Sequence, residues 1–132
     1  MVITDELKLQ VWEKGIIDDK YPSNRVRKDA CGAFILYDAF GDRNSIFGWE
    51  IDHIYPASKL NEKGYSEDKI NNIINLRPLN CKNNASKADN YPFYTASLIA
   101  SANDATNVKT NIGKVVHASI QEQLNEFYNI TE

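Results

Sequence analysis

Apolar and polar positions near the start of the chain follow the spacing of a helix. Residues 4–14 predict an amphipathic helix with Thr4 as its cap and acidic residues in its first turn. Gly15 is a natural stop for this helix. The apolar stripe that would face the core consists of Leu7, Val11 and Trp12.

A similar pattern returns at residues 112–130 and predicts a second amphipathic helix. His117 lies within it, and we interpret this histidine as a structural residue. The inward side of the helix is expected to carry Val115, Ile120, Leu124 and either Phe127 or Tyr128.

Two apolar and aromatic runs in the first half of the chain predict strands. Residues 32–38 and 46–52 have the composition of strands, and the turn-like segment 40–45 separates them. We therefore expect an antiparallel hairpin over residues 33–52. The polar, proline-containing residues 18–30 are expected to form a loop before it.

The pattern after this hairpin predicts a loop, a strand and a helix. Residues 57–72 are polar and predict a loop with one helical turn. Residues 73–79 are short and apolar and predict a strand, which Pro78 restricts to a sheet edge or a strand end. Asn80 can then cap a short helix.

Composition places these elements in one α+β domain that spans residues 1–132. Hydrophobic residues make up 42% and charged residues 25%, which is typical of a globular protein. The two cysteines, Cys31 and Cys81, are too few for a zinc site, and we interpret them as reduced thiols. No apolar run reaches the length of a membrane span, and the start of the chain lacks a secretory signal. We therefore expect a cytoplasmic protein that does not enter a membrane.

The formal net charge of −3 argues against a wholly cationic, non-specific nucleic-acid binder. It does not exclude a nuclease, because a bound divalent metal and a local basic patch can offset the acidity where a phosphate lies.

Four polar residues stand at intervals that suggest chemistry. Asp52 and His53 are adjacent at the end of a predicted strand, and Asn75 follows His53 by 22 residues. Asn84 follows Asn75 by nine residues, on the predicted helix, and Lys87 comes three residues later.

With these residues the sequence resembles the HNH endonucleases, also called ββα-metal or His-Me finger nucleases. The matching pieces are "GWEIDHIYPASK", "NLRPL" and "NNASKAD", and together they cover residues 48–89. The resemblance implies a ββα-metal finger at about residues 46–90, with an antiparallel hairpin and flanking N-terminal and C-terminal helices. It also implies a metal-dependent endonuclease of phage or bacterial type that acts on DNA, double-stranded DNA above all.

The resemblance also implies the role of each residue. His53 would be the general base, and Asp52 and Asn84 would hold the metal. Asn75, counted with the catalytic set, would brace the loop that carries the base. The residue types suit the reaction, because a neutral imidazole is a natural base near pH 7 and a hard cation takes carboxylate and amide oxygens.

An asparagine at the third position favours Mg²⁺, or Mn²⁺, over Zn²⁺, because an amide oxygen is a harder ligand than an imidazole nitrogen. Family members with a structural zinc use two CxxC-like pairs, which this sequence lacks. We therefore expect one divalent metal and no structural zinc.

Three cations are candidates for binding the substrate, and each also has a plainer interpretation. Lys87 lies one turn after Asn84 and either touches phosphate or faces the helix dipole. Arg77 either contacts the DNA backbone or sits on a solvated strand. Arg27 belongs to the basic cluster at residues 25–28, which is either a phosphate grip or a solvated face.

The sequence leaves several points open. Asn83 competes with Asn84 as the metal ligand, and Glu50 either joins the metal shell or pairs with an arginine. RNA remains possible as substrate, as does cleavage of both strands by a dimer. A different class of function is a catalytically inactive nucleic-acid-binding or interaction module built on the same finger, which the acidic charge favours.

Overall fold

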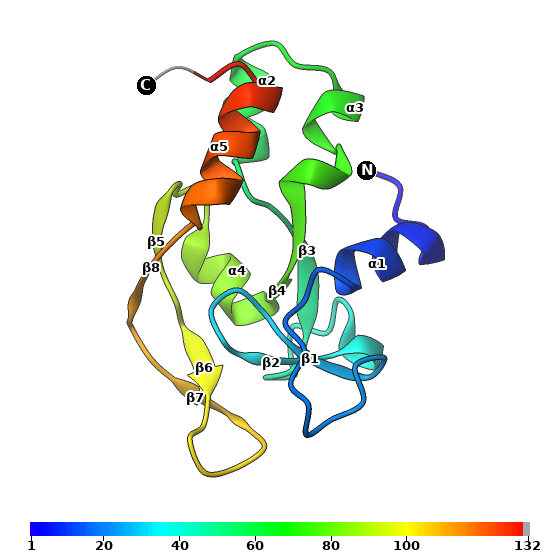
Figure 1. Ribbon diagram of the computed structural model, residues 1–132, viewed down its shortest axis with the longest axis vertical. Coiled ribbons are helices and arrows are strands. Elements are labelled where there is room, and N and C mark those ends of the chain that lie inside the picture. The colour runs from blue at the N-terminus through cyan, green and yellow to red at the C-terminus, as the bar shows by residue number, and fades with distance from the viewer. Residues whose placement is uncertain (131–132) are drawn as a thin grey trace.

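The computed structural model describes residues 1–130 and shows an α+β fold, as the sequence predicts (Figure 1). The described residues form four two-stranded antiparallel sheets. The helices are α1 (Asp5–Trp12), α2 (Ala57–Glu62), α3 (Glu67–Ile70), α4 (Cys81–Lys87) and α5 (Ala118–Phe127), with 3₁₀ turns η1 (Tyr37–Ala39) and η2 (Ile73–Asn75). The strands are β1 (Val26–Lys28), β2 (Phe34–Leu36), β3 (Trp49–His53), β4 (Leu76–Asn80), β5 (Phe93–Thr95), β6 (Leu98–Ala100), β7 (Asn107–Lys109) and β8 (Gly113–Val115).

The longest strand pair, β3 with β4, lies at the centre and runs directly into α4 (Figure 1). Trp49 pairs with Asn80 at one end and His53 pairs with Leu76 at the other. The chain between the two strands forms α2, α3 and η2, which gather beyond the His53 end of the pair. The side chain of Asn80 accepts a hydrogen bond from the Lys82 amide at 2.9 Å, so the predicted cap of this helix is confirmed.

The predicted hairpin over residues 33–52 is wrong. β2 pairs with β1, which lies inside the segment predicted as loop, and β3 pairs with β4. The two halves of the predicted hairpin are joined by two backbone hydrogen bonds, from the Leu36 amide to the Phe47 carbonyl and from the Gly41 amide to the Trp49 carbonyl, and by a parallel bridge of Phe40 with Trp49. The alternation of residues shows that a strand exists, but the partner depends on which buried faces meet.

The N-terminal helix is confirmed, because Thr4 caps α1 by accepting from the Leu7 amide at 3.1 Å and Val11 is fully buried. The C-terminal helix is shorter than predicted. Residues 113–115 form β8 instead, and Val115 is 52% exposed, so its predicted inward position is wrong. Pairing with β5 takes this segment out of the helix. Leu124, by contrast, is fully buried in α5.

The segment before α5 forms strands that the sequence pattern does not predict. β5 and β6 run out, and β7 and β8 return beside them as an antiparallel arm (Figure 1). Phe93 and Val115 pair with each other in this arm, and both side chains are exposed. Tyr94 and Leu98, in contrast, are buried. No helix within residues 1–130 is long and apolar enough to cross a membrane.

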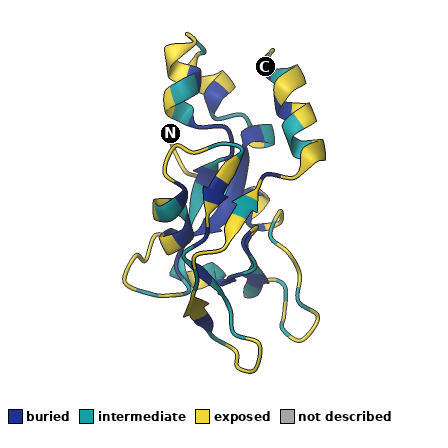
Figure 2. Ribbon diagram, turned by 90° about the vertical axis from the view of Figure 1, so that its left-hand side faces the viewer, coloured by how far each residue is buried: buried dark blue, intermediate teal, exposed yellow. Residues whose placement is uncertain are grey.

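Two apolar clusters stabilise this arrangement. The first joins α1 to β3 and β4 through Val11, Trp12, Trp49 and Leu76, with Trp12 and Trp49 ring centroids 5.2 Å apart. The second packs α5 against the α2–α3 region, with Leu60, Leu124 and Tyr128 among its members. Figure 2 shows much dark blue in the central strands and yellow on the outer sides of the helices. β4 is buried along its whole length, and β3 is buried at Trp49 and Asp52.

A buried carboxylate links the β1–β2 turn to α4. Asp29 is 0% exposed, and its two oxygens accept from the amides of Cys31, Ala33 and Asn80 and from the Asn83 side chain, at 2.9 to 3.0 Å. Burial raises the pKa of Asp29, and the four N–H donors oppose that shift. Asn83 also accepts from the amides of Ser97 and Leu98, so it ties α4 to β6.

Replacing Asn83 by alanine would leave the Asp29 carboxylate and two backbone amides short of partners in a buried place. We expect Asn83→Ala to lower the free energy of unfolding by about 2–4 kcal/mol, measured by urea denaturation. The matched control is Asn84→Ala, because this neighbour is half-buried and donates one side-chain hydrogen bond. It should cost less than about 1 kcal/mol, and equal losses for the two variants would contradict the assignment.

Candidate functional site

A buried cluster of three charges joins β3, β4 and α4. Asp52 on β3 lies directly opposite Arg77 on β4, and the Arg77 Nε donates to the Asp52 Oδ2 at 2.9 Å. The Lys87 Nζ on α4 lies 3.3 Å from the Asp52 Oδ1. All three side chains are at most 9% exposed. Both oxygens of Asp52 are therefore held by cations that come from two further elements.

Lys87 also donates to the backbone carbonyl oxygen of His53 at 3.1 Å. Burial lowers the pKa of Lys87 from its ordinary value, and the Asp52 carboxylate opposes the shift by favouring the charged form. One ammonium thus fixes both the side chain of Asp52 and the backbone of the next residue.

His53 stands at the end of β3, half-buried, where it lines a hollow of about 190 Å³. Asp52 and Asn84 line the same hollow, so three residues predicted from the sequence meet in space. The Nε2 of His53 lies 2.7 Å from the Oδ1 of Asn71, the residue that follows α3. The sequence does not predict Asn71, because no interval along the chain relates it to His53.

Asn75 is fully buried and braces the chain just after His53. Its side-chain oxygen accepts from the Tyr55 amide at 2.7 Å, and its amide nitrogen donates to the Tyr55 carbonyl at 3.0 Å. Its backbone carbonyl accepts from the Ile54 amide at 2.8 Å. These bonds fix the backbone of residues 54 and 55, as a bracing asparagine would.

The two candidate asparagines on α4 have different surroundings. Asn83 is fully buried, and its side chain bonds to Asp29 and to the backbone at the start of β6. Asn84 is half-buried and its Nδ2 donates to the Glu50 Oε1 at 2.9 Å. Because an ionised carboxylate only accepts, Glu50 fixes which end of the Asn84 amide faces it. The Asn84 Oδ1 has no hydrogen-bond partner within residues 1–130.

Glu50 pairs with an arginine, which is one of the two roles that its position on β3 suggests. Its Oε2 lies 2.6 Å from the Arg43 Nε, while its Oε1 accepts from Asn84. Arg43 precedes β3 in a turn, and its spacing in the sequence does not distinguish it from other surface cations.

The three cations proposed for substrate binding are all buried. Lys87 and Arg77 face Asp52, and Arg77 also stacks over the Tyr94 ring, with its guanidinium carbon 5.3 Å from the centroid. Arg27 is 8% exposed and donates to the carbonyls of Ser23, Glu13 and Gly15, none of which lines the hollow. The structure therefore brings Lys87 and Arg77 to the site through Asp52, and it does not bring Arg27 there.

The donors in the hollow suit a hard cation. Asp52 brings a carboxylate, whose two oxygens already face Arg77 and Lys87, and Asn84 brings an amide oxygen with an unused acceptor. Carboxylate and amide oxygens are ligands that Mg²⁺ or Mn²⁺ accepts. Within residues 1–130 no group of three or more His, Cys, Asp or Glu could hold a metal ion. Asp89 also lines this hollow, so a cation here would have Asp52, Asn84 and Asp89 as its nearby oxygen donors and would complete its shell with water or substrate, as Mg²⁺ commonly does.

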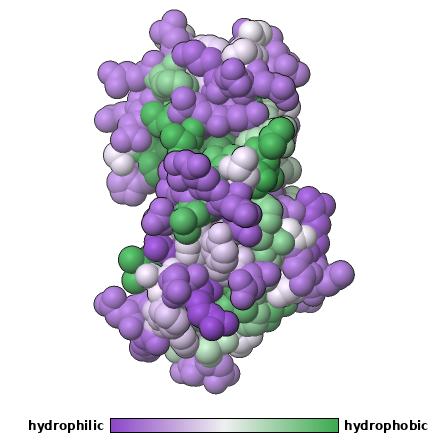
Figure 3. Space-filling model, turned by 90° about the vertical axis from the view of Figure 1, so that its right-hand side faces the viewer, coloured by the Kyte–Doolittle hydropathy of each residue, from purple (hydrophilic) through white to green (hydrophobic). Residues whose placement is uncertain are grey.

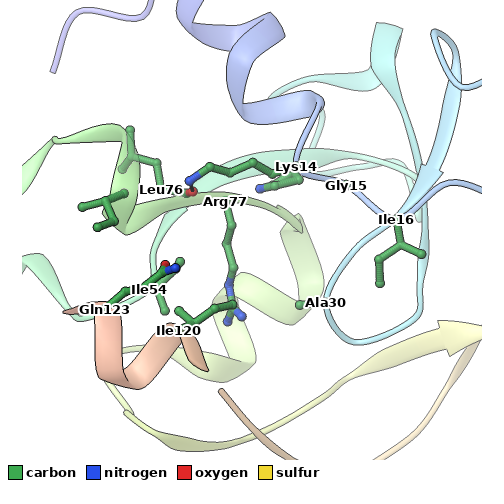
Figure 4. A pocket seen from close by; sticks show the side chains of 11 residues that line it. Lys14, Gly15, Ile16, Ala30, Ile54, Leu76, Arg77, Ile120 and Gln123 are labelled. Carbon is green, nitrogen blue, oxygen red and sulfur yellow. Dashed lines mark hydrogen bonds between the residues drawn. The ribbon is translucent and has the colours of Figure 1, made fainter. Parts of the chain in front are cut away.

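A larger, apolar pocket of about 420 Å³ lies between the end of α1, β4 and α5 (Figure 4). The described residues that line it include no His, Asp or Glu. Its Lys14 points at the start of β4 and donates to the Leu76 carbonyl at 2.6 Å, and its Arg77 donates to Asp52. Figure 3 likewise shows green apolar surface gathering about the waist of the molecule. The chemistry-bearing groups converge on the smaller hollow instead.

No family model, no curated protein and no solved structure matches this chain. A proposal about the function of this protein therefore has to be argued from the geometry of the hollow.

The charge cluster predicts that Lys87 contributes strongly to stability. Lys87→Met keeps much of the apolar stem but leaves Asp52 with one cation fewer in a buried place. We expect a loss of about 3 kcal/mol in the free energy of unfolding, measured by urea denaturation. Lys82→Met is the control on the same helix, because Lys82 is exposed, and it should change stability by less than about 0.5 kcal/mol. Equal stability of Lys87→Met and the wild type would contradict a structural ion cluster.

Proposed function

We propose that this chain is a metal-dependent endonuclease of the HNH type, in which β3, β4 and α4 form a ββα-metal finger that hydrolyses phosphodiester bonds in DNA. The observation that carries the proposal is the meeting of Asp52, His53 and Asn84 at one hollow, with Asn75 bracing the backbone next to His53. The sequence intervals suggest this set, and three separate elements supply it.

His53 has the surroundings of a general base. Its Nε2 faces the side-chain oxygen of Asn71 at 2.7 Å, and an oxygen acceptor there favours the tautomer with the proton on Nε2. The lone pair of Nδ1 then remains to take a proton from the attacking water. Lys87 and Asn75 hold the backbone that follows this ring, at the His53 carbonyl and at Tyr55. The imidazole is therefore oriented before the substrate arrives.

Asp52 and Asn84 would hold the divalent metal. When bound, the metal supplies charge neutralisation at the scissile phosphate and stabilises the leaving oxygen. Arg77 and Lys87 fix the Asp52 carboxylate in position, and Glu50 turns the Asn84 amide so that its oxygen is unused. These three residues act through the two ligands, so we assign Lys87 and Arg77 to positioning rather than to contact with the substrate.

The second candidate is a catalytically inactive binding or interaction module. The observation in its favour is that Arg77 and Lys87 already neutralise Asp52 without a metal. Against it stands the meeting of the base and the two oxygen donors at one hollow, with Asn75 bracing the backbone that follows the base. A plasmid-nicking assay with Mg²⁺ separates the two functions, because an inactive module leaves the plasmid supercoiled.

We expect His53→Ala to reduce cleavage of a supercoiled plasmid by about 10²–10⁴-fold, because the water loses its base. The fold and DNA affinity should be retained, since His53 makes one side-chain hydrogen bond. His117→Ala is the control, because this histidine caps α5 away from the hollow, and it should keep the wild-type rate. Wild-type cleavage by His53→Ala, or full activity in EDTA, would overturn the proposal.

Removal of the Asn84 oxygen should weaken metal binding and cleavage together. We expect Asn84→Ala to need at least about tenfold more Mg²⁺ for half-maximal nicking, measured as rate against metal concentration at fixed DNA. Asn84→Asp should restore much of the metal response because it again offers an oxygen. An unchanged metal requirement for Asn84→Ala would remove this residue from the metal site.

A further inference from the structure

We infer that the hollow next to Asn84, which Arg43 and Lys82 line, binds a neighbouring phosphate of the same nucleic-acid strand. This inference rests on the proposed function and names the side chains that grip the substrate. It assigns the backbone contacts to two exposed cations, in place of the three buried ones that the sequence suggests.

The two hollows share part of one wall. The larger one, of about 400 Å³, shares Asn84 and Ala88 with the hollow that contains Asp52 and His53. Glu50 and Asp52 lie two residues apart on β3, which corresponds to roughly 7 Å along a strand. Each phosphate of a DNA strand advances about 3.4 Å along the helix axis. A strand whose scissile phosphate lies at His53 can therefore place a following phosphate beside Arg43.

Arg43 has the exposure that Arg27, Arg77 and Lys87 lack. Its side chain is 79% exposed, and only its Nε is used, by Glu50 at 2.6 Å. The two terminal nitrogens have no hydrogen-bond partner within residues 1–130. Glu50 therefore orients the guanidinium while its outer edge remains open to solvent. A guanidinium held in this way can bind two oxygens of a phosphate at once.

Lys82 adds a second cation to the same hollow. It is exposed at the start of α4, and its Nζ donates one hydrogen to the Arg43 carbonyl oxygen at 2.9 Å. Two ammonium hydrogens remain for a ligand. Two nearby acids already have partners: Glu50 contacts Arg43 and Asn84, and Asp42 accepts from the Asn44 amide.

The turn that carries Arg43 is fixed against β3. Gly48 has no room for a side chain, because the Asp42 carbonyl oxygen lies 1.9 Å from the place where a Cβ would stand. The Lys82 bond to the Arg43 backbone closes the turn from the α4 side. The two cations are thus held in place before binding, which lowers the entropy lost when a phosphate arrives.

The test measures the binding of a short fluorescent DNA duplex in Mg²⁺, with His53→Ala as the background that prevents cleavage. Arg43→Gln and Lys82→Gln remove the charge but keep side-chain amides that can still donate a hydrogen bond. Each should raise Kd about threefold to tenfold and lower the slope of log K against log salt by about 0.9, the value for one lost phosphate contact. Lys109→Gln, on the exposed end of β7, is the matched control and should change neither.

A purely structural role for Arg43 would alter the melting temperature without changing the salt slope, so the slope distinguishes the two roles. If the wild type nicks plasmid but both variants keep its slope and Kd, this inference is wrong and the proposed function stands. If the wild type neither binds nor nicks DNA in Mg²⁺, both fail.

Discussion

A buried carboxylate with two cations holds together the three elements on which the site is built. Asp52 comes from β3, Arg77 from β4 and Lys87 from α4, and none of them could be buried in isolation at an acceptable cost. Each charge is tolerated only because the others are in place. The antiparallel register sets Asp52 opposite Arg77, and α4 has to follow β4 directly for Lys87 to reach them.

The cluster of Asp52, Arg77 and Lys87 lies next to backbone that is held firmly and to two side chains that line the hollow. Lys87 holds the His53 backbone as well as Asp52, and Asn75 fixes the two residues that follow. The His53 ring and the Asn84 amide each have one fixing partner, Asn71 and Glu50, and both residues line the hollow. Pre-organised groups of this kind need little rearrangement when a ligand arrives.

The positions of the cations in the fold show which of them are free to bind a ligand, and the sequence alone does not show this. Arg27, Arg77 and Lys87 look like phosphate contacts in a linear sequence, yet all three are buried and satisfy carbonyls or Asp52. Arg43 and Lys82 have no distinguishing context along the chain, yet they are exposed beside Asn84. Long cationic side chains serve either purpose, and only the surroundings of the charged end decide which one.

The sequence by itself determined the features that depend on neighbours along the chain. Thr4 capping α1, Asn80 capping α4 and the strand at Trp49–His53 are local, since their signals lie within one element. The intervals among His53, Asn75 and Asn84 also selected residues that meet or support one hollow. Tertiary structure decided the rest. It paired β3 with β4 rather than with β2, and it buried Lys87. It also placed Asn84, rather than Asn83, at the hollow, and it positioned Arg43 beside Asn84. These depend on contacts between segments far apart in the chain, where burial and the requirement to pair every buried charge outweigh local preference.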